Sequence, residues 1–121
     1  MRTFLLALIS IAISVAAQFV LKAGVTRGAA ASDEVPGVLI SKLVALMAQP
    51  LVGLGFALYG VGAILWLAVL ADWDVSKAYP IVGLGFVLAV VAGAFVGESI
   101  GPARTCGVAL ICAGVVLVAK S

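Results

Sequence analysis

The sequence has few charged residues: 10% of its 121 residues are Asp, Glu, Lys or Arg, whereas 65% are hydrophobic. A water-soluble domain of this size needs a polar exterior, and seven basic and five acidic side chains are too few to cover it. A soluble fold is therefore excluded, and we expect lipid to be the surrounding solvent. The net charge of +2 is also too small for a nucleic-acid-binding surface, so we expect no nucleic-acid partner.

Histidine is absent and cysteine is scarce, which removes several kinds of chemistry. Without histidine, no side chain has an ordinary pKa near neutrality. Cys106 and Cys112 are six positions apart in an apolar run, so on one helix they point in different directions and cannot pair. Because no Cys/His cluster or carboxylate pair falls inside an apolar segment, zinc, haem and iron–sulfur clusters have no ligands. We expect no cofactor, no metal site and no enzymatic activity.

Four charge-free stretches, the last of them residues 105–119 with a short extension ahead of it, approach the length of about 20 apolar residues that a helix needs to cross the hydrocarbon core. We expect membrane spans over residues 3–21, 50–70, 78–96 and 103–119. The first is expected to be a retained helix, because no small-residue cleavage site leads from it into a soluble segment. The expected fold is an all-α membrane protein with one four-helix transmembrane domain over residues 1–121.

The connection between the first two expected spans has two parts. Residues 24–32 are rich in Gly, Ala, Ser and Thr and precede Asp33-Glu34 and Pro36-Gly37, which indicates a solvated turn. Residues 38–49 return to a helical period with opposed polar and apolar faces but are too short to span, so we expect an amphipathic helix at the membrane interface. Pro50 then begins the second span, at a position where its missing N–H costs nothing.

The basic residues give almost no preference for one orientation in the membrane. An even number of spans places both ends of the chain on one side, with three basic residues there and four on the other side. These are Arg2, Lys77 and Lys120 against Lys22, Arg27, Lys42 and Arg104. The orientation is therefore undecided, and dual insertion is allowed.

Small residues and a short repeat predict how the helices pack. Glycines recur at seven-residue spacing, which favours close approach to another helix over a transport hinge. The pairs are Gly53 and Gly60, Gly55 and Gly62, and Gly107 and Gly114. Residues 50–58 also recur at residues 80–88, with seven of nine positions identical. An inverted repeat of a transporter would produce this pattern, but we favour shared composition because the similarity ends there.

Polar side chains inside lipid are the first candidates for function, because they are expensive to keep there. Ser10, Ser14 and Gln18 follow one another at four-residue steps and share a helix face, with Lys22 one further turn on. A hydroxyl bonded to the carbonyl four residues earlier is the simpler explanation of each serine. One carbonyl cannot satisfy the amide of Gln18, which makes this residue the stronger candidate.

Aromatic residues of the second and third spans are candidates for a pocket wall. Tyr59 and Trp66 are seven positions apart, and Tyr79-Pro80 begins the third span. A belt at the membrane interface is the alternative, above all for Tyr79.

Charged residues lie only outside the expected spans or at their ends. Lys22, Lys77 and Arg104 are membrane-surface anchors by default and would bind phosphate on a substrate that carries it. No Asp or Glu falls inside a span, so a proton-coupled exporter of cations would lack its central acid.

The order of several short motifs resembles the drug/metabolite transporter superfamily. Residues 18–22 close the first span, Ala78-Tyr79-Pro80 opens the third, Gly97-Glu98 follows it, and residues 107–114 lie in the fourth. The last segment is similar to small multidrug resistance exporters, whose pattern has a first-helix glutamate where this chain has Ser14. The other motifs are more similar to the EamA-like branch, which includes aminoarabinose–undecaprenyl phosphate flippase subunits.

The resemblance implies a flippase that moves a polyprenyl-phosphate sugar or similar amphipathic lipid across the bacterial inner membrane, as a homodimer or as a heterodimer with a related four-helix subunit. The expected substrate-binding residues are Ser14, Gln18, Lys22, Tyr59, Trp66, Tyr79, Pro80 and Arg104, with Glu98 as the candidate coupling residue. Two alternatives stay open. One is a proton-coupled exporter of small amphipathic cations that uses Glu98, and the other is a non-transporting accessory subunit of a larger membrane complex.

Overall fold

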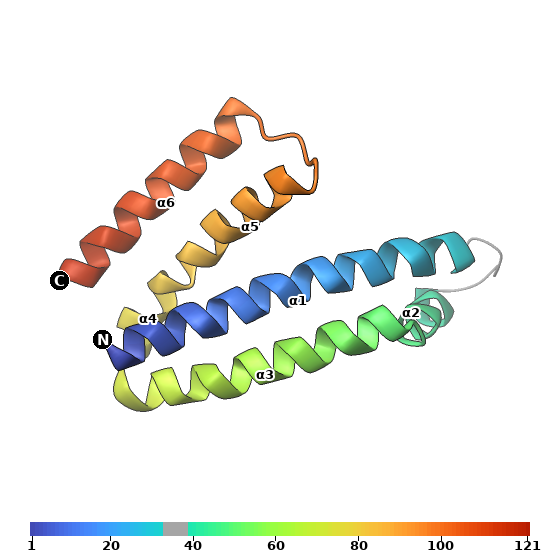
Figure 1. Cartoon of the computed structure of the whole chain (residues 1–121), viewed down its shortest axis with the longest axis horizontal. Helices are drawn as coiled ribbons and strands as arrows, with labels where there is room; N and C mark the ends of the chain where they lie inside the picture. The colour runs from blue at the N-terminus through green and yellow to red at the C-terminus, as the bar shows by residue number, and fades with distance from the viewer. Residues whose placement is uncertain (33–38) are drawn as a thin grey trace.

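The computed structural model of the chain describes residues 1–32 and 39–121 and shows helices without any strand in these ranges (Figure 1). The helices are α1 (Arg2–Ser32), α2 (Leu39–Met47), α3 (Pro50–Asp72), α4 (Val75–Ile81), α5 (Gly83–Phe95) and α6 (Pro102–Lys120).

Within the described residues, four helical stretches are long and apolar enough to cross a membrane. They are Arg2–Gly28, Pro50–Asp72, Val75–Phe95 and Pro102–Lys120. The expected all-α membrane fold with four spans is therefore confirmed. Pro50 and Pro102 each stand in the first turn of their helix, where the missing N–H has no intrahelical partner to lose.

Helices α1 and α3 lie side by side over most of their length (Figure 1). Two glycines of α3 make this approach possible. A Cβ atom at Gly55 would lie 2.6 Å from Cγ of Leu21, and one at Gly62 would lie 2.7 Å from Oγ of Ser14. The predicted seam of Gly55 and Gly62 is thus confirmed, because any larger side chain would separate the two helices.

The other two glycine pairs face open space within the described part of the chain. A Cβ atom at Gly53, Gly60, Gly107 or Gly114 would meet no described atom within 4 Å. Seven-residue spacing therefore marks one internal seam and two faces that contact no other helix among the described residues.

The first helix is longer than predicted. The turn expected over residues 24–32 is wrong, because these residues continue α1. Their small side chains serve packing: a Cβ at Gly24 would lie 2.7 Å from Cγ2 of Val52, and one at Gly28 would lie 2.6 Å from Cδ2 of Leu46. Small residues that suggested a loop in fact allow α1 to contact α2 and α3 closely.

Helix α2 occupies most of the segment predicted as an amphipathic helix, beside the end of α1 and the start of α3 (Figure 1). Five of its apolar residues are at least half exposed, namely Leu39, Ile40, Leu43, Val44 and Met47, whereas Leu46 is partly buried. Its place at the membrane interface stays a prediction. The expected turn residues 33–37, together with Val38, lie outside the described residues.

The third span is interrupted, whereas a continuous helix over residues 78–96 was predicted. Pro80 lies inside α4, where it lacks an N–H and its ring crowds the carbonyl four residues earlier. The neighbouring hydrogen bonds shorten to three-residue steps: the N–H of Val82 donates to the carbonyl of Tyr79 at 3.0 Å, and that of Gly85 to the carbonyl of Val82 at 2.8 Å. The span therefore divides into α4 and α5 at Val82.

The four spans meet most closely at the end of the molecule that holds the start of α1, the end of α3, and α4 (Figure 1). Two small core clusters lie there. One contains Ala7, Val69 and Ala78, and the other contains Ile11, Ile81 and Val115. Trp66 and Trp73 pack against both clusters. This packing joins the α1–α3 pair to α4, α5 and α6, and the candidate site lies between the two groups.

Candidate functional site

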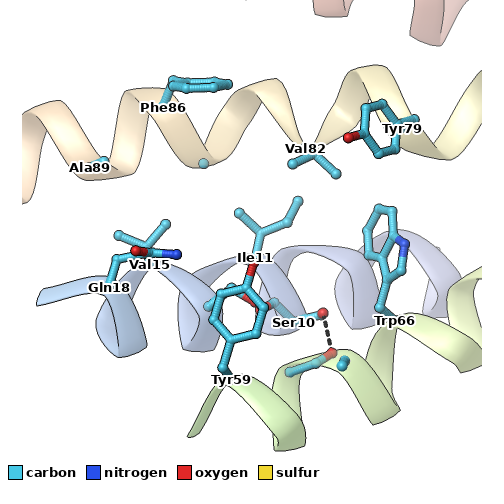
Figure 2. A pocket seen from close by; sticks show the side chains of 14 residues that line it. Ser10, Ile11, Val15, Gln18, Tyr59, Trp66, Tyr79, Val82, Phe86 and Ala89 are labelled. Atoms are coloured by element: carbon cyan, nitrogen blue, oxygen red, sulfur yellow. Dashed lines mark hydrogen bonds between the residues drawn. The ribbon is translucent and has the colours of Figure 1, made fainter. Parts of the chain in front are cut away.

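A cavity of about 490 Å³ lies between the α1–α3 pair and the α4–α5 wall (Figure 2). Five predicted substrate-binding residues line it: Ser14 and Gln18 from α1, Tyr59 and Trp66 from α3, and Tyr79 from α4. The rest of its lining is small or apolar apart from Ser10. The structure thus brings together residues from three helices, whereas the sequence could relate to one another only residues of the same helix.

The two serines of the cavity wall are already hydrogen-bonded. Ser14 donates to the carbonyl of Ser10 at 2.9 Å, which confirms the simpler explanation for Ser14. Ser10 instead donates across to the carbonyl of Gly62 at 2.7 Å, in a buried bond that ties α1 to α3 (Figure 2). The oxygen of Ser14 keeps its capacity to accept a hydrogen bond from a ligand.

Gln18 is the polar group that the fold leaves available. It is exposed, and within the described residues its amide makes no hydrogen bond. In Figure 2 the amide lies on the side of α1 that faces α5. An amide offers two donor hydrogens and an acceptor oxygen, which suits the hydroxyl groups of a sugar.

The aromatic residues differ in how firmly they are held. Trp66 is half-buried and packs against both core clusters, so it closes one end of the cavity as well as lining it. Tyr59 is 45% exposed and Tyr79 is 70% exposed. Both tyrosines therefore have room to change rotamer around a ligand.

Lys22 and Glu98 stand together just beyond the opposite end of the cavity. Nζ of Lys22 lies 3.8 Å from Oε1 of Glu98, and both side chains are exposed. The last lining residues on α1 and α5 are Gln18 and Ala89. Lys22 is one turn beyond Gln18 on α1, and Gly93 is one turn beyond Ala89 on α5. The carboxylate of Glu98 packs against Gly93, because a Cβ atom there would lie only 2.6 Å from Oε2 of Glu98. The ion pair therefore bridges α1 and the α5–α6 connection at the mouth of the cavity.

Besides Lys22 and Glu98, two further predicted site residues lie outside the cavity lining. Pro80 borders a separate groove on the far side of the α4–α5 wall. Arg104 is in the first turn of α6 and donates to the carbonyl of Ser99 at 3.2 Å. Lys77, expected at the opposite membrane surface, stacks over the ring of Trp73 at 4.8 Å.

Several other lining residues were not among the candidates from the sequence, and three of them belong to patterns that were visible there. Gly62 is one of the seam glycines, while Gly85 and Phe86 belong to the segment that repeats residues 50–58. The repeat of residues 50–58 at residues 80–88 was the signal in the sequence that could have identified Gly85 and Phe86. Its second glycine lets α5 approach α1, since a Cβ at Gly85 would lie 3.2 Å from Cγ2 of Ile11.

The chain is similar over about half of its length to bacterial flippase subunits. A 63-residue match, 40% identical, covers 51% of this chain and 55% of the probable 4-amino-4-deoxy-L-arabinose-phosphoundecaprenol flippase subunit ArnE of Pseudomonas savastanoi pv. phaseolicola. Proteins of the same name from Escherichia coli O139:H28 and Shigella boydii serotype 18 are 37% identical over 70 residues, 57% of this chain and 63% of the relative. The resemblance to flippase subunits is confirmed. No family model and no solved structure matches the chain.

The match spans between half and two thirds of these relatives' length. Their names describe transport subunits and not enzymes, in agreement with the expectation for this chain. The relatives come from bacteria, and proteins with several membrane-spanning helices belong to the inner membrane there, because outer-membrane proteins are built as barrels. The chain is a multi-pass protein of the bacterial inner membrane.

Proposed function

We propose that the chain is one subunit of a flippase that moves a polyprenyl-phosphate-linked sugar, or a similar amphipathic lipid, across the bacterial inner membrane. The cavity between α1, α3 and the α4–α5 wall carries this proposal. Its volume of about 490 Å³ is in the range of small-molecule sites. It combines mostly apolar walls with the free amide of Gln18, and it lies inside a bundle of membrane spans.

The cavity would hold the polar headgroup while the chain of the lipid stays outside. Gln18 and the oxygen of Ser14 would hydrogen-bond sugar hydroxyls, with Tyr59 and Tyr79 as adaptable neighbours. Translocation needs no covalent step, because shielding the headgroup removes most of the cost of moving polar groups through hydrocarbon. Each of these roles follows from position in the cavity wall.

Lys22 would bind the phosphate at the mouth of the cavity. Its ammonium group is paired with Glu98 at 3.8 Å in an exposed pair, which is a weak interaction. The phosphodiester of such a lipid carries one negative charge on two non-bridging oxygens, so it can take the place of the carboxylate as the charged partner of Lys22. The substrate would therefore replace Glu98 as the partner of Lys22 on entering. The pair of Lys22 and Glu98 would form again when the substrate leaves.

The residues that line the cavity make an exporter of small cations the weaker alternative. Export of small cations requires an acid in the binding site, and no Asp or Glu is among the residues that line the cavity. Resistance to quaternary ammonium compounds that depends on pH and disappears in Glu98→Gln would favour the exporter. By contrast, Ser14→Glu should not create efficient resistance, because the surrounding wall is apolar.

We further propose that the working unit is a dimer, of two copies or with a related four-helix subunit. The support comes from the open faces of Gly53 and Gly60 on α3 and of Gly107 and Gly114 on α6. Small residues mark helix contacts in membranes. Cross-linking in native membranes should give dimers, and finding only monomers with intact transport would contradict the proposal.

The main test compares two lysines in reconstituted vesicles. Lys22→Ala should weaken binding of an undecaprenyl-phosphate sugar roughly ten- to a hundredfold, since charge-assisted hydrogen bonds to phosphate contribute about 1.5–3 kcal/mol. Lys120→Ala, at the last turn of α6, is the control and should bind normally. Gln18→Leu should also lose binding while inserting and folding as the wild type does. Equal binding and flipping by Lys22→Ala would return Lys22 to the role of a surface anchor.

A further inference from the structure

The carboxylate of Glu98 is held in place by the turn that ends α5. Gly97 has a φ of 92°, a left-handed conformation that glycine adopts without strain. The turn brings the N–H of Glu98 to the carbonyl of Gly93, to which it donates at 2.9 Å, as at many helix ends. The side chain then folds back on Gly93, where a Cβ atom would lie only 2.6 Å from Oε2. The backbone therefore determines where this carboxylate stands.

Lys22 reaches the carboxylate from α1 with a long side chain that is 72% exposed. The distance of 3.8 Å between Nζ of Lys22 and Oε1 of Glu98 makes this a loose ion pair, and exposed pairs of this kind are weak. Within the described residues, neither group has a second ion-pair partner. The pair thus joins a carboxylate fixed by its turn to an ammonium group that can take other positions, and a ligand can reach both charges.

The two charges stand at the end of the cavity where the amide of Gln18 lies. Figure 2 shows Gln18 on α1 and Ala89 on α5 at this end, whereas Trp66 lies at the other. Lys22 follows Gln18 by four residues, or roughly 6 Å along the helix axis. A sugar ring whose hydroxyl groups bond to the amide of Gln18 is therefore within reach of both charges.

A ligand with a single charge would break this ion pair without replacing it. An anion bound to Lys22 leaves the carboxylate of Glu98 without a partner, and a cation bound to Glu98 leaves the ammonium group of Lys22 without one. Because the ligand also covers the mouth of the cavity, it removes water from the charge that is left, which costs free energy. A headgroup that carries both charges avoids this cost, since it forms two ion pairs in place of one.

We propose that Glu98 is a specificity-determining residue, which binds an ammonium group on the sugar while Lys22 binds the phosphodiester of the same lipid. This inference rests on the proposed function and narrows its substrate to a polyprenyl-phosphate amino sugar. The headgroup of such a lipid carries one positive and one negative charge on the two sides of a sugar ring, which complements the Lys22–Glu98 pair. The protein exchanges its own ion pair for two ion pairs with the substrate.

The position of Glu98 also sets the orientation of the headgroup. No Asp or Glu is among the described residues that line the cavity, so its wall offers no anion to an ammonium group. The aromatic side chains of the wall are weaker partners for a cation than a carboxylate is. The amine and the phosphate would therefore both stay at the mouth, and the uncharged edge of the sugar would point inward, toward Ser14 and Tyr59.

Carbodiimide coupling of the wild-type protein in bilayer nanodiscs tests the contact directly. The reagent joins a carboxylate and an amine that touch into an amide, with loss of water. Without lipid we expect a cross-link between Glu98 and Lys22. With an undecaprenyl-phosphate amino sugar we expect the lipid amine on Glu98 instead, and none on Asp72 or Asp74, the control carboxylates at the other end of the bundle. Lipid on all three carboxylates, or an unchanged Lys22–Glu98 cross-link with the lipid bound, would overturn the proposal.

Binding selectivity tests the role of the charge. The matched ligand is the same lipid with a hydroxyl group in place of the amine. The wild type should bind the amino lipid about tenfold more tightly, because a hydrogen bond between two charged groups is stronger than one that a neutral hydroxyl donates. Glu98→Gln should bind the two lipids equally. Asp74→Asn removes an exposed carboxylate just before α4 and is the control, which should keep the selectivity of the wild type.

The same measurements separate failure of this inference from failure of the proposed function. If the wild type binds neither lipid, the proposed function is wrong. If the wild type binds both lipids equally, or if Glu98→Gln keeps the preference for the amino lipid, the proposed function stands and the role of Glu98 is wrong. Carbodiimide coupling of the wild type decides the matter if Glu98→Gln fails to fold.

Discussion

Residues 50–58 and 80–88 share seven of nine positions, yet one segment begins a helix and the other interrupts one. Pro50 is the first residue of α3, which runs for 23 residues without a break. Pro80 lies inside α4, which ends one residue later. The difference lies in what precedes each proline. Gln49 is extended, with φ −70° and ψ 132°, so no helical hydrogen bond is lost at Pro50, whereas helix already precedes Pro80.

The glycines of the two segments show what the repeat has in common. The second glycine of each faces α1: a Cβ at Gly55 would lie 2.6 Å from Cγ of Leu21, and one at Gly85 would lie 3.2 Å from Cγ2 of Ile11. The first glycines differ, because Gly83 packs against α6 whereas Gly53 meets no described atom within 4 Å. The common feature of the two segments is therefore the contact of their second glycine with α1.

Helices α3 and α5, which contain most of the two segments, are also followed or ended by a similar contact. Asp72, the last residue of α3, accepts a hydrogen bond from Thr3 at 2.7 Å. Glu98, just after α5, pairs with Lys22. Each repeat is therefore followed by a carboxylate that contacts α1, one near its start and the other two thirds of the way along it. The cavity lies between these two attachments.

Filling the second glycine of the first segment should have the largest effect on stability. Gly55→Leu would place its side chain on Leu21 and separate α1 from α3, which should lower the free energy of unfolding by roughly 2–3 kcal/mol. Gly53→Leu is the control and should change it by less than about 0.5 kcal/mol. Thermal unfolding in detergent measures both. An equally large loss in Gly53→Leu would show that its face is buried in an oligomer.

Replacing each proline by alanine should change stability and transport at Pro80 but not at Pro50. Pro80→Ala should stabilise the span by about 1 kcal/mol, less than the roughly 3 kcal/mol that proline costs in a helix interior, because three-residue hydrogen bonds already compensate in part. The straightened helix would move Tyr79 and Val82, so flipping should fall. Pro50→Ala should leave both unfolding and flipping unchanged. Unaltered flipping in Pro80→Ala would show that transport does not need the break.

The phenylalanines of the two segments should differ in transport and not in stability. Phe86 borders both the cavity and the groove, whereas Phe56 lines neither of them. Phe86→Ala should reduce flipping about tenfold, which corresponds to about 1.4 kcal/mol, and Phe56→Ala should flip normally. Both side chains are more than half exposed, so thermal unfolding should change little in either variant. Equal flipping by the two variants would contradict a special role of the second segment.

Removing a carboxylate that contacts α1 should have the smallest effect. Glu98→Gln removes an exposed ion pair and should cost roughly 0.2–1 kcal/mol of stability at low salt, with the difference from wild type vanishing in concentrated salt. Asp72→Asn keeps an acceptor for Thr3 and should be neutral at any salt concentration. Thermal unfolding at two ionic strengths distinguishes them. A loss in Glu98→Gln that salt does not change would mean that its packing on Gly93 matters more than its charge.

The candidate site was predictable in part. The four-residue steps from Ser14 to Gln18 identified one wall of the cavity, because helical periodicity is visible in one segment. That Tyr59 and Tyr79 lie beside this wall depends on how three helices meet. The sequence also offered Arg104 as a phosphate ligand on grounds of charge alone, and the fold places it outside the cavity lining.

The four spans and their all-helical character followed from the sequence by itself. In hydrocarbon every backbone N–H and C=O must be satisfied within the protein, so a long apolar run has helix as its one local solution. Only the tertiary structure decided that residues 24–32 extend α1, that Pro80 divides the third span and that Gly55, and not Gly53, faces another helix. Glycine pairs look alike in a sequence, and their roles differ because close packing depends on which helix faces meet in three dimensions.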